Sequence, residues 1–154
     1  MKVFIAILLA LLLLTPNVRA EDTATASAAS ATSEPYEPGI GDIMPQQQER
    51  HIKLWFAGRS GNWPLADYEI DKLKDGFGDV NKLIGGDTVE KSVGAAITAL
   101  EKAVDAKDRE AFTRGFDQLS TGCNSCHRTL DHAFIVIARP TSLPFSNQIF
   151  VPQR

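Results

Sequence analysis

Sulfur is scarce in this chain of 154 residues, which contains two cysteines and two methionines. Two cysteines exclude a fold held together by several disulfides. Basic residues are also outnumbered: 16 lysines and arginines face 19 aspartates and glutamates, a formal net charge of −3. Because nucleic-acid binding needs a basic surface, the composition gives no support for a nucleic-acid partner. Apolar and polar residues do not alternate over any useful length, so a sheet is not expected.

The chain has one long apolar run, at residues 3–14. This run is too short to span a bilayer. Val18 and Ala20 place small residues three and one before a cut after residue 20, and no cysteine follows the run that could carry a lipid. An uncleaved anchor is the alternative, but Pro16 would end its helix. Residues 1–20 therefore predict a cleavable signal peptide, export to the periplasm and no stable membrane anchor.

The rest of the chain predicts a linker followed by one helical domain at 42–154. Residues 21–41 are rich in Ala, Ser and Thr and then in Pro and Gly, which indicates a disordered linker. Apolar residues then recur at steps of three and four. This spacing predicts four helices, at 42–57, 62–84, 87–106 and from Asp108 to Phe134, with Asp42, Asn62 and Asp108 as N-caps and Pro45 in the first turn of the first helix. Short connections favour antiparallel neighbours. We expect an all-α antiparallel four-helix bundle, with an extended tail from Arg139 packed back over it.

The most informative motif is C-x-x-C-H, formed by Cys123, Cys126 and His127. Two thiols three residues apart on one helical turn can add to the two vinyl groups of one porphyrin, and the adjacent imidazole can ligate its iron. Both cysteines continue the apolar stripe of the last helix, which runs through Phe112, Phe116 and Leu119 to Leu130 and Phe134. This predicts a haem facing the bundle interior. We therefore expect one covalently attached haem c, with His127 as proximal ligand. Haem is attached to thiols after export, so the motif and the signal peptide support each other.

Three other interpretations of the cysteine pair remain open. A redox dithiol of the thioredoxin kind would open a helix after a strand, and no such pattern surrounds the pair. A closed zinc site would need two more ligands, and only His51 and His132 are available, at unsuitable spacings. A plain disulfide between the two cysteines leaves His127 unexplained.

A helical domain with C-x-x-C-H on its last helix resembles the cytochrome c prime and cytochrome c-556 group of four-helix-bundle haem proteins, over residues 42–130. In that group the first helix carries a basic residue near the haem propionates. Four residues later comes the residue that faces the distal side of the iron. The resemblance implies these two roles for Arg50 and Leu54. Leu54 would leave the iron five-coordinate, with a hydrophobic distal pocket.

The sixth iron ligand stays open at this stage. His51 lies one turn before Leu54, near the same helix face, and could ligate the iron or hydrogen-bond a propionate or a carboxylate. Met44 is ten residues before Leu54, about 15 Å along a helix axis, and is more typical of a capping or core residue. The candidates are therefore His51, Met44 or no protein ligand.

These patterns predict a periplasmic one-electron carrier that meets redox partner proteins and is not an enzyme. The alternative is a five-coordinate haem protein that binds nitric oxide or carbon monoxide, which requires an open distal site. A peroxidase would need a distal base with a charged helper. Arg50 and His51 are turned about 100° apart on a helix, which makes joint action awkward. Bundles of this type often dimerise, so a homodimer is one option.

Overall fold

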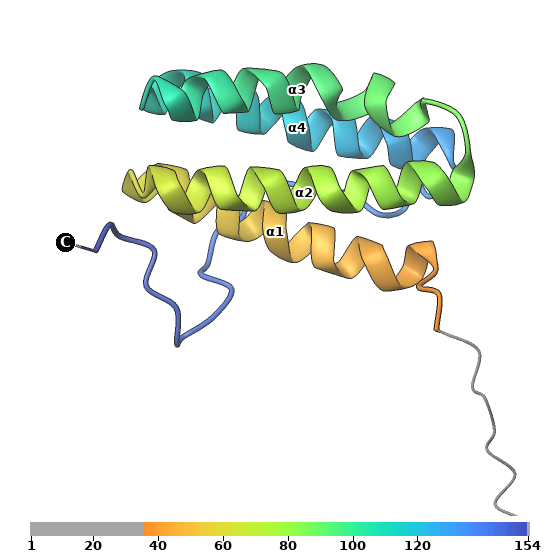
Figure 1. Ribbon diagram of the computed structural model, residues 1–154, viewed down its shortest axis with the longest axis horizontal. Coiled ribbons are helices and arrows are strands. Elements are labelled where there is room, and N and C mark those ends of the chain that lie inside the picture. The colour runs from red at the N-terminus through yellow and green to blue at the C-terminus, as the bar shows by residue number, and fades with distance from the viewer. Residues whose placement is uncertain (1–35, 154) are drawn as a thin grey trace, which may run out of the picture. The chain divides into compact units, whose positions relative to one another are not determined.

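The computed structural model describes residues 36–153, so the predicted signal peptide and most of the predicted linker lie outside the described residues. Within this range the protein has four helices and no strand (Figure 1): α1 (Ile40–Ser60), α2 (Trp63–Ile84), α3 (Thr88–Asp105) and α4 (Arg109–Thr129). α1 packs against α2 and α4, and α3 packs against the same two helices. The all-helical prediction is confirmed, and the arrangement is consistent with a four-helix bundle. None of the described helices is both long and apolar enough to cross a membrane.

The start of α1 differs from the prediction. Asp42 was expected to be the N-cap, but Gly39 occupies that position and the helix begins at Ile40. Asp42 instead accepts a hydrogen bond from the Gly39 N–H with its Oδ2, at 2.9 Å. A carboxylate in the first turn also lies near the positive end of the helix dipole, which favours this earlier start. Pro45 therefore lies inside the helix rather than in its first turn.

Other helix ends follow the predicted cap residues. The Asn62 side chain accepts a hydrogen bond from the Leu65 N–H at the start of α2. Asp108 does the same for two N–H groups at the start of α4. Both of these predicted caps are confirmed. The end of α1 differs: the helix was predicted to stop at residue 57 but continues to Ser60, where Gly61 caps it with a φ of 73°, the left-handed conformation that glycine adopts without strain.

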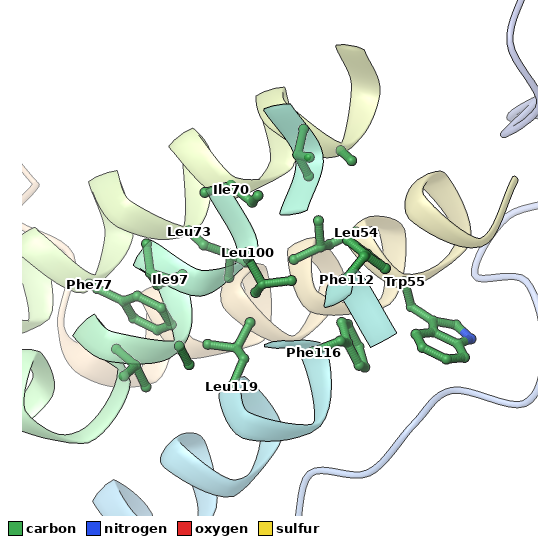
Figure 2. Packing of buried hydrophobic residues seen from close by; sticks show 14 of the residues in the cluster. Leu54, Trp55, Ile70, Leu73, Phe77, Ile97, Leu100, Phe112, Phe116 and Leu119 are labelled. Carbon is green, nitrogen blue, oxygen red and sulfur yellow. The ribbon is translucent and has the colours of Figure 1, made fainter. Parts of the chain in front are cut away.

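Phe112, Phe116 and Leu119 of α4 are fully buried and join side chains from all the other helices in one core (Figure 2). Full burial of one such side chain stabilises the fold by about 1.5–3 kcal/mol. The predicted stripe of α4 is therefore confirmed up to Leu119. It is wrong at Phe134, which is 80% exposed. α4 ends at Thr129, and the left-handed conformation of Asp131 (φ 61°) turns the chain away from the core.

The residues after α4 run over the bundle without regular secondary structure. Phe150 is buried and its ring centroid lies 5.9 Å from that of Phe56 on α1. Arg139 Nε donates to Asp117 of α4 at 2.7 Å, and the Arg139 guanidinium lies over Trp55 of α1, 4.9 Å from the ring centroid. The tail packs back onto α1 and α4, as predicted. Part of it does not, because four apolar tail residues are exposed: Leu143, Phe145, Ile149 and Val151.

Candidate functional site

An apolar cavity of about 450 Å³, here called the α1–α4 cavity, lies among α1, α2, α4 and the start of the tail. Ligand sites in proteins are typically about 300–1,000 Å³ and mostly apolar, with a few polar groups. The α1–α4 cavity has this size and character. Its wall is formed by Ile40, Gly41, Met44, Pro45, Gln47, Gln48 and His51 of α1, by Leu73, Phe77, Val80 and Ile84 of α2, and by Cys123, His127, Leu130, His132, Ile135 and Ile137.

Two of the three C-x-x-C-H side chains line this cavity. Cys123 and His127 are four residues apart, so they share one face of α4. Cys126 is not part of the wall, and its thiol contacts Ser92 of α3. Both cysteines are free thiols. Burial raises the pKa of Cys123 to about 12 and also raises the pKa of Cys126. Redox-active thiols have a lowered pKa, so these two have the opposite character.

The His127 imidazole is held by the tail. Its Nδ1 lies 2.8 Å from the Ile135 carbonyl oxygen. Because a carbonyl oxygen only accepts, Nδ1 carries the proton and donates it, and in the neutral ring the lone pair lies on Nε2. Asn124 fixes the same tail segment, since its side chain exchanges two hydrogen bonds with the Ile137 backbone at 2.7 and 2.8 Å. This is the arrangement in which proteins orient a metal-binding histidine.

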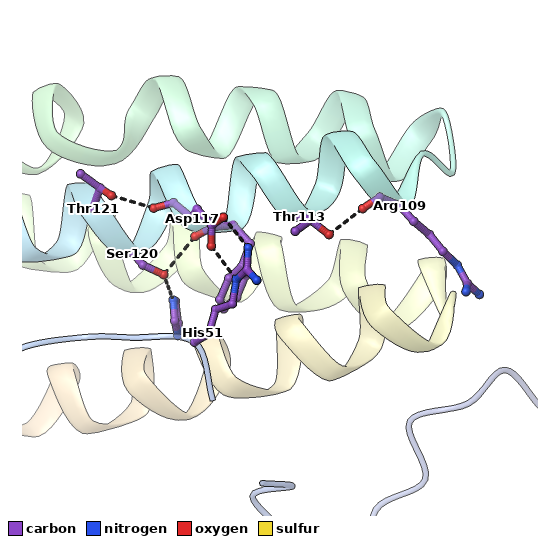
Figure 3. A network of polar contacts seen from close by, with 8 residues as sticks. His51, Arg109, Thr113, Asp117, Ser120 and Thr121 are labelled. Carbon is purple, nitrogen blue, oxygen red and sulfur yellow. Dashed lines mark hydrogen bonds and ion pairs between the residues drawn. The ribbon is translucent and has the colours of Figure 1, made fainter. Parts of the chain in front are cut away.

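His51 enters the cavity wall from α1, and its protonation can be assigned from its partners. Its Nε2 lies 2.8 Å from Ser120 Oγ, a contact that belongs to the polar network along α4 in Figure 3. The Ser120 hydroxyl donates to the Phe116 carbonyl at 3.0 Å. Since this hydroxyl has one proton, His51 Nε2–H donates to Ser120 Oγ, and Nδ1 holds the lone pair. Burial lowers the pKa of His51 to about 4, so the ring is neutral at pH 7.

Arg50 does not line the α1–α4 cavity. Its Nη1 lies 3.1 Å from Oε2 of Glu69 on α2, and the Glu69 side chain is almost completely buried. Burial raises the pKa of Glu69, and the hydrogen bond from Arg50 opposes that rise. The guanidinium also lies over the Tyr68 ring, 5.7 Å from its centroid. The Arg50 side chain is thus engaged in neutralising a buried carboxylate.

Leu54 is fully buried in the core and is also absent from the cavity wall. Met44 lies in the wall, about two turns before His51 on α1. The structure therefore brings Cys123, His127 and His51 to one cavity, together with Met44. It does not bring Arg50 and Leu54 there.

Gln47, a buried side chain in the cavity wall, was not among the predicted site residues. Its Oε1 has no hydrogen-bond partner among residues 36–153. The spacing offered a signal, because Gln47 lies one turn before His51 and so shares its helix face. Asn124 and Ile135 were missed as well. A tail carbonyl that meets His127 cannot be read from residue spacing.

Residues 36–153 contain no group of three His, Cys, Asp or Glu side chains that could hold a metal ion. Within that range the cysteine pair therefore lacks the further ligands of a closed zinc site. Comparison of the chain with protein-family models, with curated proteins and with solved structures gave no match. The function of the site must be inferred from its own residues.

Proposed function

We propose that this chain is a periplasmic c-type cytochrome, a one-electron carrier whose haem occupies the α1–α4 cavity of an antiparallel four-helix bundle. Cys123 and Cys126 would attach the haem and His127 would ligate its iron. One observation carries the proposal. Cys123 and His127 line the same apolar cavity, and the hydrogen bond from His127 Nδ1 to the Ile135 carbonyl leaves Nε2 free as a ligand.

The residues present fit a covalently held haem. Each thiol would add across one vinyl group: a sulfur–carbon bond forms and the thiol hydrogen goes to the neighbouring vinyl carbon, so no oxidant is consumed. Cys123 already lines the cavity, whereas the Cys126 side chain would have to turn away from Ser92. When bound, the haem supplies a one-electron couple at its iron. The protein supplies the ligand, its orientation and the surroundings.

His127 and the cavity wall would set the behaviour of the iron. A backbone carbonyl that accepts a hydrogen bond from Nδ1–H fixes the ring orientation. It also makes the imidazole a stronger electron-pair donor to a metal. The apolar wall excludes water, which changes the relative stability of the two oxidation states. The excess of acidic residues suits redox partner proteins that present a basic patch. Export by the predicted signal peptide belongs to this proposal.

The second candidate function is binding of nitric oxide or carbon monoxide at an open iron site. It is favoured by the His51 hydrogen bond: because Nε2 donates to Ser120, ligation would need either Nδ1 or loss of that bond. A peroxidase receives no such support. Arg50, the charged helper considered for it, is paired with Glu69 outside the cavity wall.

The test is expression of the full chain in a bacterium that has the machinery for haem attachment. We expect a periplasmic protein, cleaved after Ala20, that keeps its haem on a denaturing gel and shows reversible one-electron reduction. Replacing Cys123 and Cys126 together by Ala should abolish the haem stain. A wild-type chain that carries no covalent haem would refute the proposal. Low-spin spectra unchanged by carbon monoxide would favour the carrier, and a high-spin spectrum that shifts would favour the gas-binding protein.

A further inference from the structure

The two thiols of the C-x-x-C-H motif are presented to different neighbours. Cys123 lines the α1–α4 cavity. Cys126 does not line it, and its thiol is hydrogen-bonded to the side chain of Ser92 on α3. A haem that enters the cavity therefore meets one thiol directly, while the second thiol is held against the neighbouring helix.

The direction of the hydrogen bond between Cys126 and Ser92 follows from the other contact of Ser92. The Ser92 hydroxyl donates to the Thr88 carbonyl oxygen at 2.8 Å, one turn earlier on α3. A hydroxyl has one proton and two lone pairs, so Ser92 Oγ accepts from the thiol. Cys126 S–H is thus the donor, and the backbone of α3 fixes Ser92 in the accepting orientation.

Gly122 of α4 keeps Ser92 close to the motif. A Cβ at position 122 would lie 3.1 Å from Val93 Cγ1 and closer still to the Ser92 carbonyl oxygen, so a side chain has no room there. α3 and α4 therefore touch one turn before Cys126, and the two helices run side by side (Figure 1). They are consecutive along the chain, so this contact can form before the tail docks.

We propose that Ser92 is a positioning residue for haem attachment, which holds Cys126 aside so that Cys123 forms the first thioether bond and Cys126 the second. This inference rests on the proposed haem function. In each step a sulfur–carbon bond forms and the thiol hydrogen goes to the neighbouring vinyl carbon, so neither step consumes an oxidant. The second step is intramolecular, because the first bond already tethers the porphyrin. Its high effective concentration offsets the hydrogen bond that Cys126 loses on leaving Ser92.

The test uses variants of the full chain that keep one cysteine. Cys126→Ala can react only through Cys123, and Cys123→Ala only through Cys126. Each chain, prepared without haem, is mixed with haem under a reductant in the absence of oxygen, and mass spectrometry follows the covalent product. We expect Cys126→Ala to attach haem faster than Cys123→Ala. Adding Ser92→Ala should speed attachment to Cys123→Ala about fivefold, the factor that corresponds to one ordinary hydrogen bond, and leave Cys126→Ala unchanged.

Two substitutions and one spectrum separate positioning from a merely structural role. Ser125→Ala is the matched control, since it removes a hydroxyl next to Cys126 and leaves Ser92 in place. It should not change the attachment rate of Cys123→Ala. Ser92→Thr keeps a hydroxyl and should attach haem at the rate of the serine. In haem-free Cys123→Ala the only thiol is that of Cys126, and its S–H stretching frequency should rise when Ser92→Ala removes the acceptor.

The inference is overturned if Ser92→Ala leaves either the attachment rate of Cys123→Ala or its S–H stretching frequency unchanged. It is also overturned if the two single-cysteine chains attach haem at the same rate. Covalent haem in the wild type would in both cases still uphold the proposed function. A wild-type chain that attaches no haem would refute the two proposals together.

Discussion

Asn124 exchanges two hydrogen bonds with the backbone of Ile137: its Nδ2 donates to the Ile137 carbonyl at 2.8 Å, and its Oδ1 accepts from the Ile137 N–H at 2.7 Å. Asn124 is the first variable position of the C-x-x-C-H motif. Two residues before Ile137 lies the carbonyl that accepts from His127. One side chain inside the motif thus anchors the tail segment that orients the motif's own histidine.

Replacing Asn124 by Ala should release this segment. Loss of two hydrogen bonds is expected to lower the free energy of unfolding by about 1–2 kcal/mol and to speed amide exchange at Ile137. Asn124→Asp keeps the hydrogen-bond acceptor but loses the donor. Its free energy of unfolding should therefore lie between those of the wild type and Asn124→Ala. In the haem-loaded protein, His127 would lose its fixed partner, the Ile135 carbonyl, and would become a weaker electron-pair donor to the iron. The reduction potential should therefore rise. Urea unfolding, hydrogen exchange and a redox titration measure these effects. Exchange at Ile137 equal to that of the wild type would contradict the expectation.

The buried His51 should make the chain without haem less stable in acid. Its pKa is about 4 when folded, against 6.5 as its ordinary value. Below pH 6.5 His51 binds a proton in the unfolded chain but stays neutral in the folded chain. The free energy of unfolding therefore falls as the pH drops from 6.5 to 4. The expected loss from this group is about 3 kcal/mol at most. Urea unfolding across this range provides the measurement.

His51→Leu isolates the histidine contribution from that of the acidic residues. The variant loses the hydrogen bond to Ser120, so it should be less stable than the wild type at pH 7. Its stability should nevertheless depend less on pH between 6.5 and 4, because the remaining titrating groups are shared. Parallel pH curves for the two proteins would show that His51 is not buried and neutral.

The stability of the fold should depend strongly on Arg50, the partner of the buried Glu69 carboxylate. Arg50→Met would leave the buried Glu69 carboxylate without its counter-charge, at a cost of about 2–3 kcal/mol at pH 7. The pKa of Glu69, already raised by burial, should rise further, so stability should recover as the pH falls and the carboxyl becomes protonated. Glu69→Gln in the Arg50→Met background should restore part of the loss. Chemical unfolding of the three variants at pH 5 and pH 7 measures this, and equal losses at both pH values would argue against it.

Gly122 permits close contact of α3 and α4 beside the cysteine motif. A Cβ at this position would lie 2.3 Å from the Ser92 carbonyl oxygen. Gly122→Ala should therefore force the helices apart and lower the free energy of unfolding by about 1–3 kcal/mol. Gly78→Ala is the control: nothing lies within 4 Å of its Cβ, and alanine favours helix, so stability should rise by up to about 1 kcal/mol. Thermal unfolding compares the two, and a neutral Gly122→Ala would show that the contact relaxes freely.

The helices and the core face of α4 were predictable because apolar spacing is a local property. Phe112, Phe116 and Leu119 lie where that spacing put them. Phe134 failed because a left-handed turn at Asp131 ends the helix, and the spacing of apolar residues contains no sign of that conformation.

The residues facing the motif depend on how α1 is placed along α4, which is a tertiary property. Leu54 and His51 are one turn apart on nearly the same face, so the pattern could not choose between them. In the structure His51 and Gln47 line the cavity, and Leu54 lies in the core. Neither the wall formed by the tail nor the missing partner of Gln47 is encoded in a local pattern.

The walls of the α1–α4 cavity come from segments far apart along the chain, from Ile40 at the start of α1 to Ile137 in the tail. No early fragment can therefore build it, however well its helices form. A folding chain whose tail has not yet docked presents Cys123 and His127 on an unfinished wall, open from the side. It follows that a group as wide as a porphyrin would have its freest access at this stage of folding. Docking of the tail then closes the route behind it.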